Sequence, residues 1–526
     1  MRFNHLRRRE FVTLLGGAAA WPLAARAQQQ IWRAGDPFSL GVAAGSPHPD
    51  GFVLWTRLAP DPLSADPATP GGMTDGSISV SYEIASDPGM HDVVLKGNAN
   101  AEPEFAHSVH VEVSGLQPGR PYWYRFMSGD AVSRVGRAIT APSPGNALER
   151  LRFGFVSCSN YEHGYFAAYR HLANDNPDFT LFLGDYIYDT VERRRPTVRK
   201  HADGVPSKTL ANYRNRYSQY QLDPDLQRFR ADVPALVTWD DHEVQNDYGD
   251  QWSEVFEDPA QFLLRRAAAY QAFYENMPVR PSLSRLSGPS MRVYDRFTFG
   301  NLVEVSMIDG RQYRSRQACY GPPNHGGGHA ETNASCAELA DPDRSMIGFQ
   351  QEAWLFDGLA HSPARWNVIG QDVLMAQFQR KGADGVGFWS DDWNGFPASR
   401  TRLLQSIHDA DVSNVVVLGG DIHSFWANDL KLDFDDPYSP TVATEFVGTS
   451  ISSFPPPPET IVPQLPAYPH IRFFDSSRRG YATVDVDRRQ MNIRFRALSD
   501  AVDPNASAFT LRTFTVEDGH PGVLTG

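Results

Sequence analysis

The feature that most constrains the fold is a short apolar run that recurs along the chain and is followed at once by polar residues. Such runs predict buried strands, because they are shorter than most buried helices and several of them end in Gly. They occupy residues 151–158, 179–183, 235–239, 302–308, 366–370 and 415–420. Because each run is followed by side chains that can bind metals or take part in acid–base chemistry, the pattern bears on function as well as on fold.

A helical pattern alternates with these strands. Phe166, Tyr169 and Leu172 recur at helical spacing between the first two runs. Alternating strands and helices predict a layered α/β domain, and in open α/β sheets ligands gather beyond the carboxyl ends of the strands. We therefore expect the functional site at one edge of the sheet.

Residues 36–142 follow a different pattern, with short strands at 51–56, 78–84 and 107–113 separated by turns. The last two alternate apolar and polar residues, as half-buried strands of a sandwich do. Residues 114–126 resemble the turn and tyrosine-corner strand of fibronectin-like domains. We expect an N-terminal β-sandwich of the fibronectin or immunoglobulin type beside the α/β domain. An independent ligand-binding module is the alternative.

The first 27 residues have the three regions of an export signal: a basic start, an apolar stretch at 14–20 and small residues at 25–27. The Arg8-Arg9-x-Phe11 arrangement resembles a twin-arginine signal, which exports folded proteins. We expect a periplasmic or secreted protein that uses the twin-arginine export machinery. A short membrane anchor is the alternative, although the apolar stretch is too short to span a bilayer comfortably.

The charge of the chain restricts its partners. The net charge is −13, and removal of residues 1–27, with five basic residues and one acidic residue, makes it −17. An acidic surface argues against nucleic acid as a bulk-surface partner. A phosphate site would need concentrated local positive charge, which metal ions would provide. No later segment is long enough for a transmembrane helix, so we do not expect an integral membrane protein.

The chain has three cysteines, too few for a disulfide scaffold. Cys319 and Cys336 flank a loop rich in Gly, Pro and Asn, and in an oxidising compartment they could pair across it. Cys158 is then left over. An unpaired thiol in an exported protein is either buried and inert or recruited for chemistry.

The side chains at the strand ends form an unusual set. They are Cys158, Asp185, Tyr188, Asp240, Asp241, His242, Glu243, Asp309, Gln371, Asp372, Asp421 and His423. If they were brought together without neutralisation, these groups would repel strongly, and bound cations resolve that conflict. Thiolate and imidazole suit a transition metal, whereas carboxylate and carboxamide oxygens suit a hard cation such as calcium. The set therefore indicates more than one kind of ion.

In order and spacing, six motifs resemble the alkaline phosphatase D family, within the metallophosphoesterase class that includes purple acid phosphatases. They are Ser157-Cys158, Gly184-Asp185-x-x-Tyr188, Trp239-Asp240-Asp241-His242-Glu243, Asp309-x-Arg311-Gln312-Tyr313-Arg314, Gly420-Asp421-Ile422-His423 and residues 445–450. The resemblance spans nearly all of the α/β part, and the sandwich segment resembles the N-terminal domain of the family. It implies a four-layer α/β/β/α catalytic fold.

The resemblance also implies a ferric ion beside a calcium ion. By analogy Asp185 bridges the metals. Cys158, Tyr188 and His423 lie on the iron side, and Asp241, Gln371 and Asp421 face the calcium side. His242 resembles the histidine that contacts the phosphoryl oxygens and helps the leaving group, with Asp241 beside it in the catalytic motif.

Several of these residues also have plainer interpretations. Cys158 could be a small buried hydrophobe, Tyr188 could pack its ring, and His242 could be a neutral core histidine. Arg311 and Arg314 could pair with carboxylates or bind the substrate phosphate. The segment 390–397 resembles a family loop in which Asn394 and Phe396 replace an expected Asp and Tyr, a departure that bears on substrate preference.

The expected reaction is hydrolysis of phosphate monoesters, diesters or both, by water activated at two cations. The main rival is a phosphodiesterase or phospholipase D-type hydrolase, since the same metals serve both ester classes. A rival from another class is an extracellular binding protein with a non-catalytic scaffold. A zinc hydrolase of unrelated fold would leave the tyrosine ligand unexplained.

These inferences divide the chain into an export signal at 1–27, a β-sandwich at 36–142, a catalytic domain at 150–503 and a tail of the catalytic domain at 504–526. We expect a monomer that binds a small phosphate ester.

Overall fold

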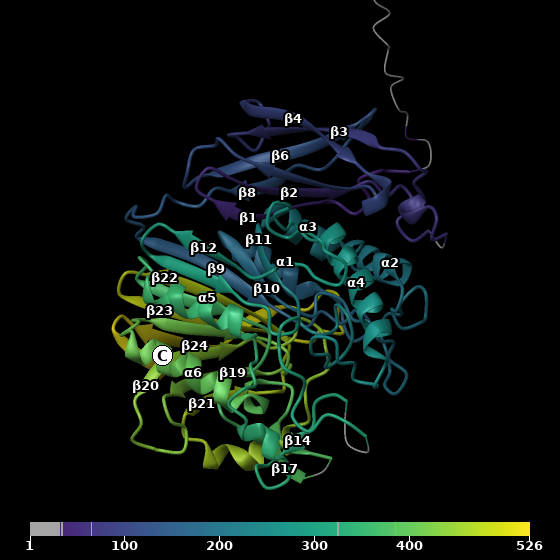
Figure 1. The fold of residues 1–526 in the computed structure, drawn as a ribbon. Coiled ribbons are helices and arrows are strands. Elements are labelled where there is room, and N and C mark those ends of the chain that lie inside the picture. The colour runs from purple at the N-terminus through teal and green to yellow at the C-terminus, as the bar shows by residue number, and fades with distance from the viewer. Residues whose placement is uncertain (1–31, 33–34, 65, 323–325, 384, 526) are drawn as a thin grey trace, which may run out of the picture.

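The computed structural model describes residues 32–525 except 33–34, 65, 323–325 and 384. Two large mixed sheets pack face to face, and helices cover their outer faces (Figure 1). The expected α/β/β/α layers with a preceding β-sandwich are thereby confirmed. The expected export signal at residues 1–27 lies outside the described residues.

The first sheet has ten strands and contains the first and the last strand of the described chain. In spatial order its strands are β25 (His520–Thr525), β24 (Ala508–Glu517), β23 (Gln490–Leu498), β22 (Gly480–Asp487), β9 (Arg150–Val156), β10 (Phe179–Leu183), β11 (Ala235–Thr238), β1 (Val42–His48), β2 (Gly51–Arg57) and β5 (Ser108–Val113). Strands β9, β10 and β11 are parallel, so their carboxyl ends lie at one edge.

The second sheet has seven strands. In order they are β12 (Asp295–Phe299), β13 (Val303–Met307), β15 (Trp366–Gly370), β18 (Val415–Gly419), β20 (Thr441–Val447), β19 (Phe425–Lys431) and β21 (Ile471–Asp475). Strands β13, β15, β18 and β20 are parallel. Each apolar run that was predicted to be a strand forms a strand, and each of these strands is one of the parallel strands of the two sheets.

The helices fall into two groups. Four follow or separate the parallel strands of the first sheet: α1 (Ala167–Asn174), α2 (Leu210–Gln221), α3 (Pro224–Asp232) and α4 (Pro259–Asn276). Two belong to the second sheet: α5 (Phe349–Ala360) and α6 (Pro397–Asp409). Asp223 and Asp258 begin α3 and α4 by accepting hydrogen bonds from the first free backbone N–H groups, with Pro in the first turn.

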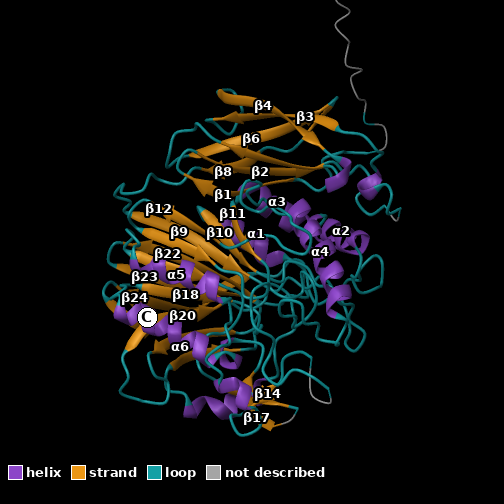
Figure 2. Cartoon of the chain, in the orientation of Figure 1, coloured by secondary structure: helices purple, strands orange, loops and turns teal. Residues whose placement is uncertain are grey.

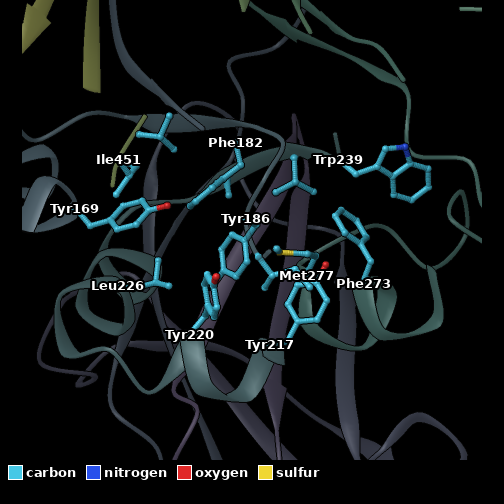
Figure 3. Close-up of a cluster of buried hydrophobic side chains, with 14 of the residues drawn as sticks. Tyr169, Phe182, Tyr186, Tyr217, Tyr220, Leu226, Trp239, Phe273, Met277 and Ile451 are labelled. Atoms are coloured by element: carbon cyan, nitrogen blue, oxygen red, sulfur yellow. The ribbon is translucent and has the colours of Figure 1, made fainter. Parts of the chain in front are cut away.

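Side chains of the strands alternate between two cores. In β10, Leu181 and Leu183 pack between the sheets, whereas Phe182 faces the helices. Figure 3 shows the helix-side core, in which Phe182 lies with Tyr169, Tyr217, Phe273 and other aromatic side chains. Because both faces of β10 are buried, the strand reads as a continuous apolar run.

The N-terminal segment forms a sandwich that is continuous with the first sheet. One layer contains β4 (Val93–Ala101), β3 (Ile78–Ala85), β6 (Pro121–Ser128), β7 (Ala131–Val132) and β8 (Gly136–Ile139). The other layer is β1, β2 and β5, and β1 joins β11 through Gly45 and Ala235. The backbone N–H of Gln117 donates to the Tyr122 hydroxyl at 3.0 Å, as in a tyrosine corner.

A small third sheet lies apart from the main layers. It consists of β14 (Ala330–Glu331), β17 (Gly385–Trp389) and β16 (Gln379–Gly382). Figure 2 shows loops gathered beyond the strand ends, between the helices and the pair β14 and β17. Among the described helices, none has the length and apolar character needed to cross a membrane.

Candidate metal centre and active site

The polar side chains predicted from the strand ends converge at the carboxyl edge of both sheets. Four of them, Cys158, Asp185, Asp421 and His423, have left-handed backbone with φ between 53° and 62°. Residues other than Gly seldom adopt this conformation, and such strain is concentrated at functional sites. Here the turns direct side chains from β9, β10 and β18 toward a common centre.

One cluster combines a thiol, a carboxylate and an imidazole. Ligand atoms of Cys158, Asp185 and His423 all lie within 4.8 Å of one another. The hydroxyl of Tyr188 joins them, since it donates to Asp185 Oδ2 at 2.7 Å and lies 3.0 Å from His423 Nε2. The predicted iron-side residues are therefore brought together.

Backbone groups fix the imidazole of this cluster. Nδ1 of His423 lies 2.9 Å from the Phe454 carbonyl oxygen, which can only accept, so Nδ1 carries the proton. Nε2 is then left with its lone pair facing Tyr188 and Asp185. Burial lowers the pKa of His423 to about 3, which keeps the ring neutral and able to act as a ligand.

Glu243 supports the strained turn after β10. Its carboxylate accepts hydrogen bonds from the backbone N–H groups of Asp185 at 3.1 Å, Tyr186 at 2.6 Å and Asp240 at 2.9 Å. It therefore links the ends of β10 and β11 and sets the direction of the Asp185 side chain.

A second cluster shares Asp185 with the first. Ligand atoms of Asp185, Asp241 and His242 lie within 4.8 Å of one another. Nδ1 of His242 lies 2.7 Å from Asp189 Oδ1, and the other oxygen of Asp189 accepts from Arg265 at 2.9 Å. The His242 side chain is 12% exposed, so a substrate can reach it.

A third cluster contains only carboxylates: Asp241, Asp247 and Asp391. Asp241 Oδ2 accepts from the backbone N–H of Asp247 at 2.6 Å. Asp247 in turn accepts from the backbone N–H of Gly328 at 2.7 Å. Asp247 and Asp391 lie in loops beyond the strands, and the sequence analysis assigned a role to neither.

Arg311 and Arg314 are buried among these carboxylates. Arg311 contacts Asp240 at 2.6 Å and Asp391 at 2.7 Å, and Arg314 forms an ion pair with Asp391. Both guanidinium groups are fully enclosed. Of the two interpretations open from sequence, carboxylate pairing or phosphate contact, the geometry favours pairing.

The end of β15 places Asp372 rather than Gln371 toward the carboxylates. The Gln371 carboxamide is bound to both backbone groups of Val373, and its oxygen also accepts from Trp393 Nε1 at 3.1 Å. Asp372 instead lies 3.5 Å from Arg311 Nε. Asp421 lies outside the three clusters, so its predicted ligand role and that of Gln371 stay predictions.

The electrostatics of the site are dominated by burial of acidic groups. Burial, together with the charge of neighbouring carboxylates, raises the pKa of Cys158, Tyr188 and Asp421, the last to about 7. Burial also raises the pKa of Asp372 to about 6. A nearby cation would reverse each of these shifts, because it favours the charged form.

His242 shows the opposite balance. Burial alone would lower its pKa, but Asp241, Asp185 and Asp189 raise it well above the usual value. The ring is thus held as a proton donor at the half-buried face of the site.

The donor set fits metal ions. Among the described residues, buried oxygens of Asp240, Asp241 and Asp372 find no hydrogen-bond donor. Unpaired buried carboxylate oxygens are costly, and cation binding satisfies them. Cys158, Tyr188 and His423 suit a transition metal, whereas the carboxylate cluster suits a hard cation.

Cys319 and Cys336 form a disulfide, the pairing that the sequence left open. The loop that they close contains Gly328, which binds Asp247. Cys158 is buried and unpaired.

Comparison with known proteins agrees with this geometry. Residues 153–495 match the family described as PhoD-like phosphatase, and residues 24–142 match the PhoD-like phosphatase N-terminal domain. The chain is 40% identical to alkaline phosphatase D of Bacillus subtilis (strain 168) over 494 residues, which cover 93% of this chain and 82% of the relative.

A solved structure titled "Structure of PhoD" superimposes with a TM-score of 0.86 at 39% identity, covering 93% of this chain and 92% of that one. The resemblance seen in the motifs is thereby confirmed over both parts of the chain. The chain belongs to the PhoD-like phosphatase family and is a phosphoric ester hydrolase.

Proposed function

We propose that this phosphatase hydrolyses phosphate monoesters, diesters or both with the help of a ferric ion and a calcium ion. The observation that carries the proposal is the position of Asp185, which belongs both to the cluster with Cys158 and His423 and to the cluster with Asp241 and His242. A carboxylate shared in this way is placed to bridge two cations.

The residues divide by ligand preference. Cys158, Tyr188 and His423 would supply sulfur, phenolate and imidazole to an iron ion, and Asp185 would serve both ions. Asp241 would face the calcium ion with Gln371 and Asp421, as proposed from sequence. Asp247 and Asp391, which share a cluster with Asp241, extend this oxygen-rich side.

Bound cations withdraw charge from phosphoryl oxygens and lower the pKa of water, so the protein need not supply a strong base. The His242 side chain is only 12% exposed, and it holds a proton on a ring that Asp189 orients. We assign it to contact the phosphoryl oxygens and to donate a proton to the leaving group. Asp189 and Arg265 position this ring.

The test combines metal analysis with a substrate panel. Phenyl phosphate, a bis-aryl phosphate and phosphatidylcholine are supplied to the purified protein, before and after chelation. We expect hydrolysis of at least one aryl phosphate, loss of activity with loss of metal, and recovery on reloading with iron and calcium. Full activity of the metal-free protein would exclude the mechanism, and cleavage of phosphatidylcholine alone would favour a phospholipase.

We further propose that residues 1–27 direct twin-arginine export to the periplasm or medium, and that the enzyme is a monomer divided at 36–142, 150–503 and 504–526. Residues 508–525 form β24 and β25 of the first sheet, which supports assigning the tail to the catalytic part.

A further inference from the structure

Arg380 is a cation near the site that no carboxylate of the described residues contacts directly. It lies on β16, and its guanidinium carbon is 3.7 Å from the centre of the Trp389 ring on the paired strand β17. Its Nε is enclosed without a hydrogen-bond partner among the described residues. Arg380 thus differs from Arg311 and Arg314, which are held by carboxylates.

The stacked arginine lines an open cavity. The cavity has a volume of about 480 Å³, and its lining includes Arg380, Lys381 and Trp389 on the hairpin and Glu459 and Thr460 opposite. The lining therefore contains two cationic side chains, Arg380 and Lys381, and one carboxylate, Glu459. In a protein with a net charge of −13, this local positive balance is unusual.

The two chain segments that line the cavity also contain, or lie next to, residues of the active site. Trp389 is followed by Asp391, a member of the carboxylate cluster. On the other wall, the chain just before Glu459 contains Ser453, which donates to the Tyr188 hydroxyl at 2.7 Å, and Phe454, which binds His423.

The charge of Arg380 also reaches the site. Its strongest electrostatic partner is Asp392, followed by Asp421, Asp247 and Asp391, although none of the four forms an ion pair with it in the described part of the chain. Arg380 therefore lines the open cavity and interacts electrostatically with carboxylates of the site.

We propose that this cavity binds the leaving group of the ester and that Arg380 pairs with an anionic substituent there. The proposal rests on the proposed function and names its substrate class: esters whose leaving alcohol carries a second negative charge, such as a carboxylate. The indole of Trp389 holds the guanidinium plane in place by stacking, which leaves its edge free for a bidentate contact with an anion.

The test compares phenyl phosphate with 3-carboxyphenyl phosphate, whose leaving phenols have similar acidity. We expect the wild-type protein to prefer the carboxylated ester. Arg380→Gln should lower kcat/KM for that ester about 10- to 100-fold, mainly through KM, and should change kcat/KM for phenyl phosphate by a much smaller factor. Arg380→Lys should restore part of the preference.

A binding measurement supports the kinetics. 3-Hydroxybenzoate should inhibit the wild-type protein competitively and Arg380→Gln more weakly by the same factor, whereas phenol should inhibit both equally. Lys381→Gln, on the exposed rim, is the second variant and should lower the preference several-fold. Arg512→Gln, exposed on β24, is the matched control and should change nothing.

Three results would overturn the inference: no wild-type preference for the carboxylated ester, equal loss on both esters in Arg380→Gln, or unchanged inhibition by 3-hydroxybenzoate. Failure of the proposed function is distinguishable, because in that case the wild-type protein would hydrolyse neither ester.

Discussion

Among the single residues of the site, Asp189 supports the role that we propose for His242 as a proton donor. One oxygen of Asp189 contacts Nδ1 of the ring and the other accepts from Arg265, so the carboxylate fixes both the ring orientation and the position of its proton. The remaining nitrogen, Nε2, is free to face the substrate. This arrangement resembles the carboxylate support found behind many catalytic histidines.

Replacement of Asp189 by Asn should lower kcat about 10- to 100-fold while leaving KM and metal content nearly unchanged. The negative charge of Asp189 raises the pKa of His242, so its loss lowers that pKa, and the alkaline limb of the kcat profile should move to lower pH. Steady-state kinetics across pH, together with metal analysis, checks both effects.

The matched control is Asp225→Asn, which removes the partner of Arg170 at a half-buried ion pair outside the site. The Asp225→Asn variant should have the same pH profile of kcat as the wild-type protein. An Asp189→Asn enzyme with the wild-type profile and rate would show that the contact with His242 is only structural.

The residues that sequence could identify are those directly after strands, since parallel strands bring their carboxyl ends together. Cys158, Asp185, Asp241 and His423 are of this kind. Asp189 is only four residues beyond Asp185, but nothing in its neighbours distinguishes it from a solvent-exposed loop acid. Arg380 could not be found, because its proposed role depends on the absence of a carboxylate contact among the described residues, which only the folded chain reveals.

At the scale of elements, the disulfide and the small third sheet form one unit beside the site. Cys319 and Cys336 close a loop that binds Asp247 through Gly328 and that also contains β14. Strand β14 pairs with β17, where Ala330 lies opposite Trp389. The disulfide thus restrains the hairpin that carries Arg380.

The double variant Cys319→Ser/Cys336→Ser should be less stable by about 3 kcal/mol, the entropy expected for a loop of this length. Because the loop supports the cavity wall, KM for the carboxylated ester should rise several-fold while kcat for phenyl phosphate changes little. Thermal unfolding and kinetics measure the two effects, and wild-type protein treated with reductant should behave like the variant. An unchanged Tm and KM would disprove the coupling.

Of the strands in the two large sheets, the sequence predicted β9, β10, β11, β13, β15 and β18 from their apolar runs, and β2 and β5 from the short strands of the N-terminal segment. It did not predict that β1 joins β11, since this contact pairs one residue of each strand across 190 residues of chain. Contacts between Gly45 and Ala235 leave no periodic signal. The hairpin of β16 and β17 was missed for a similar reason, because its residues are mostly polar or Gly.

At the scale of the whole molecule, buried neutral histidines should make the fold sensitive to acid. Burial lowers the pKa of His110 and of His470 to about 4. His110 stacks on Tyr274 with ring centres 4.6 Å apart, and its Nε2 binds the Met277 carbonyl oxygen at 2.9 Å. This contact joins the N-terminal sandwich to α4 and the segment that follows it.

Since these rings are neutral in the folded state, their contribution to stability is complete above pH ~6.5 and is lost as the pH falls toward 4, where the unfolded chain takes up the protons. His110→Gln should reduce the loss of unfolding free energy between pH 7 and pH 4.5 by on the order of 1 to 2 kcal/mol. Denaturant titrations at several pH values measure it. The exposed His91→Gln is the control. An equal change of unfolding free energy with pH in the wild-type protein and in His110→Gln would contradict the prediction.

We propose that strand-end residues from both sheets form one metal centre, with Asp185 between its two halves. The most direct measurement is the metal content and phosphatase activity of Asp185→Asn, compared with the wild-type protein and with Asp130→Asn in the N-terminal sandwich. The account predicts that the wild-type protein and Asp130→Asn contain iron and calcium and hydrolyse aryl phosphates, whereas Asp185→Asn loses both metal and activity. An Asp185→Asn protein with wild-type metal content and activity would contradict it.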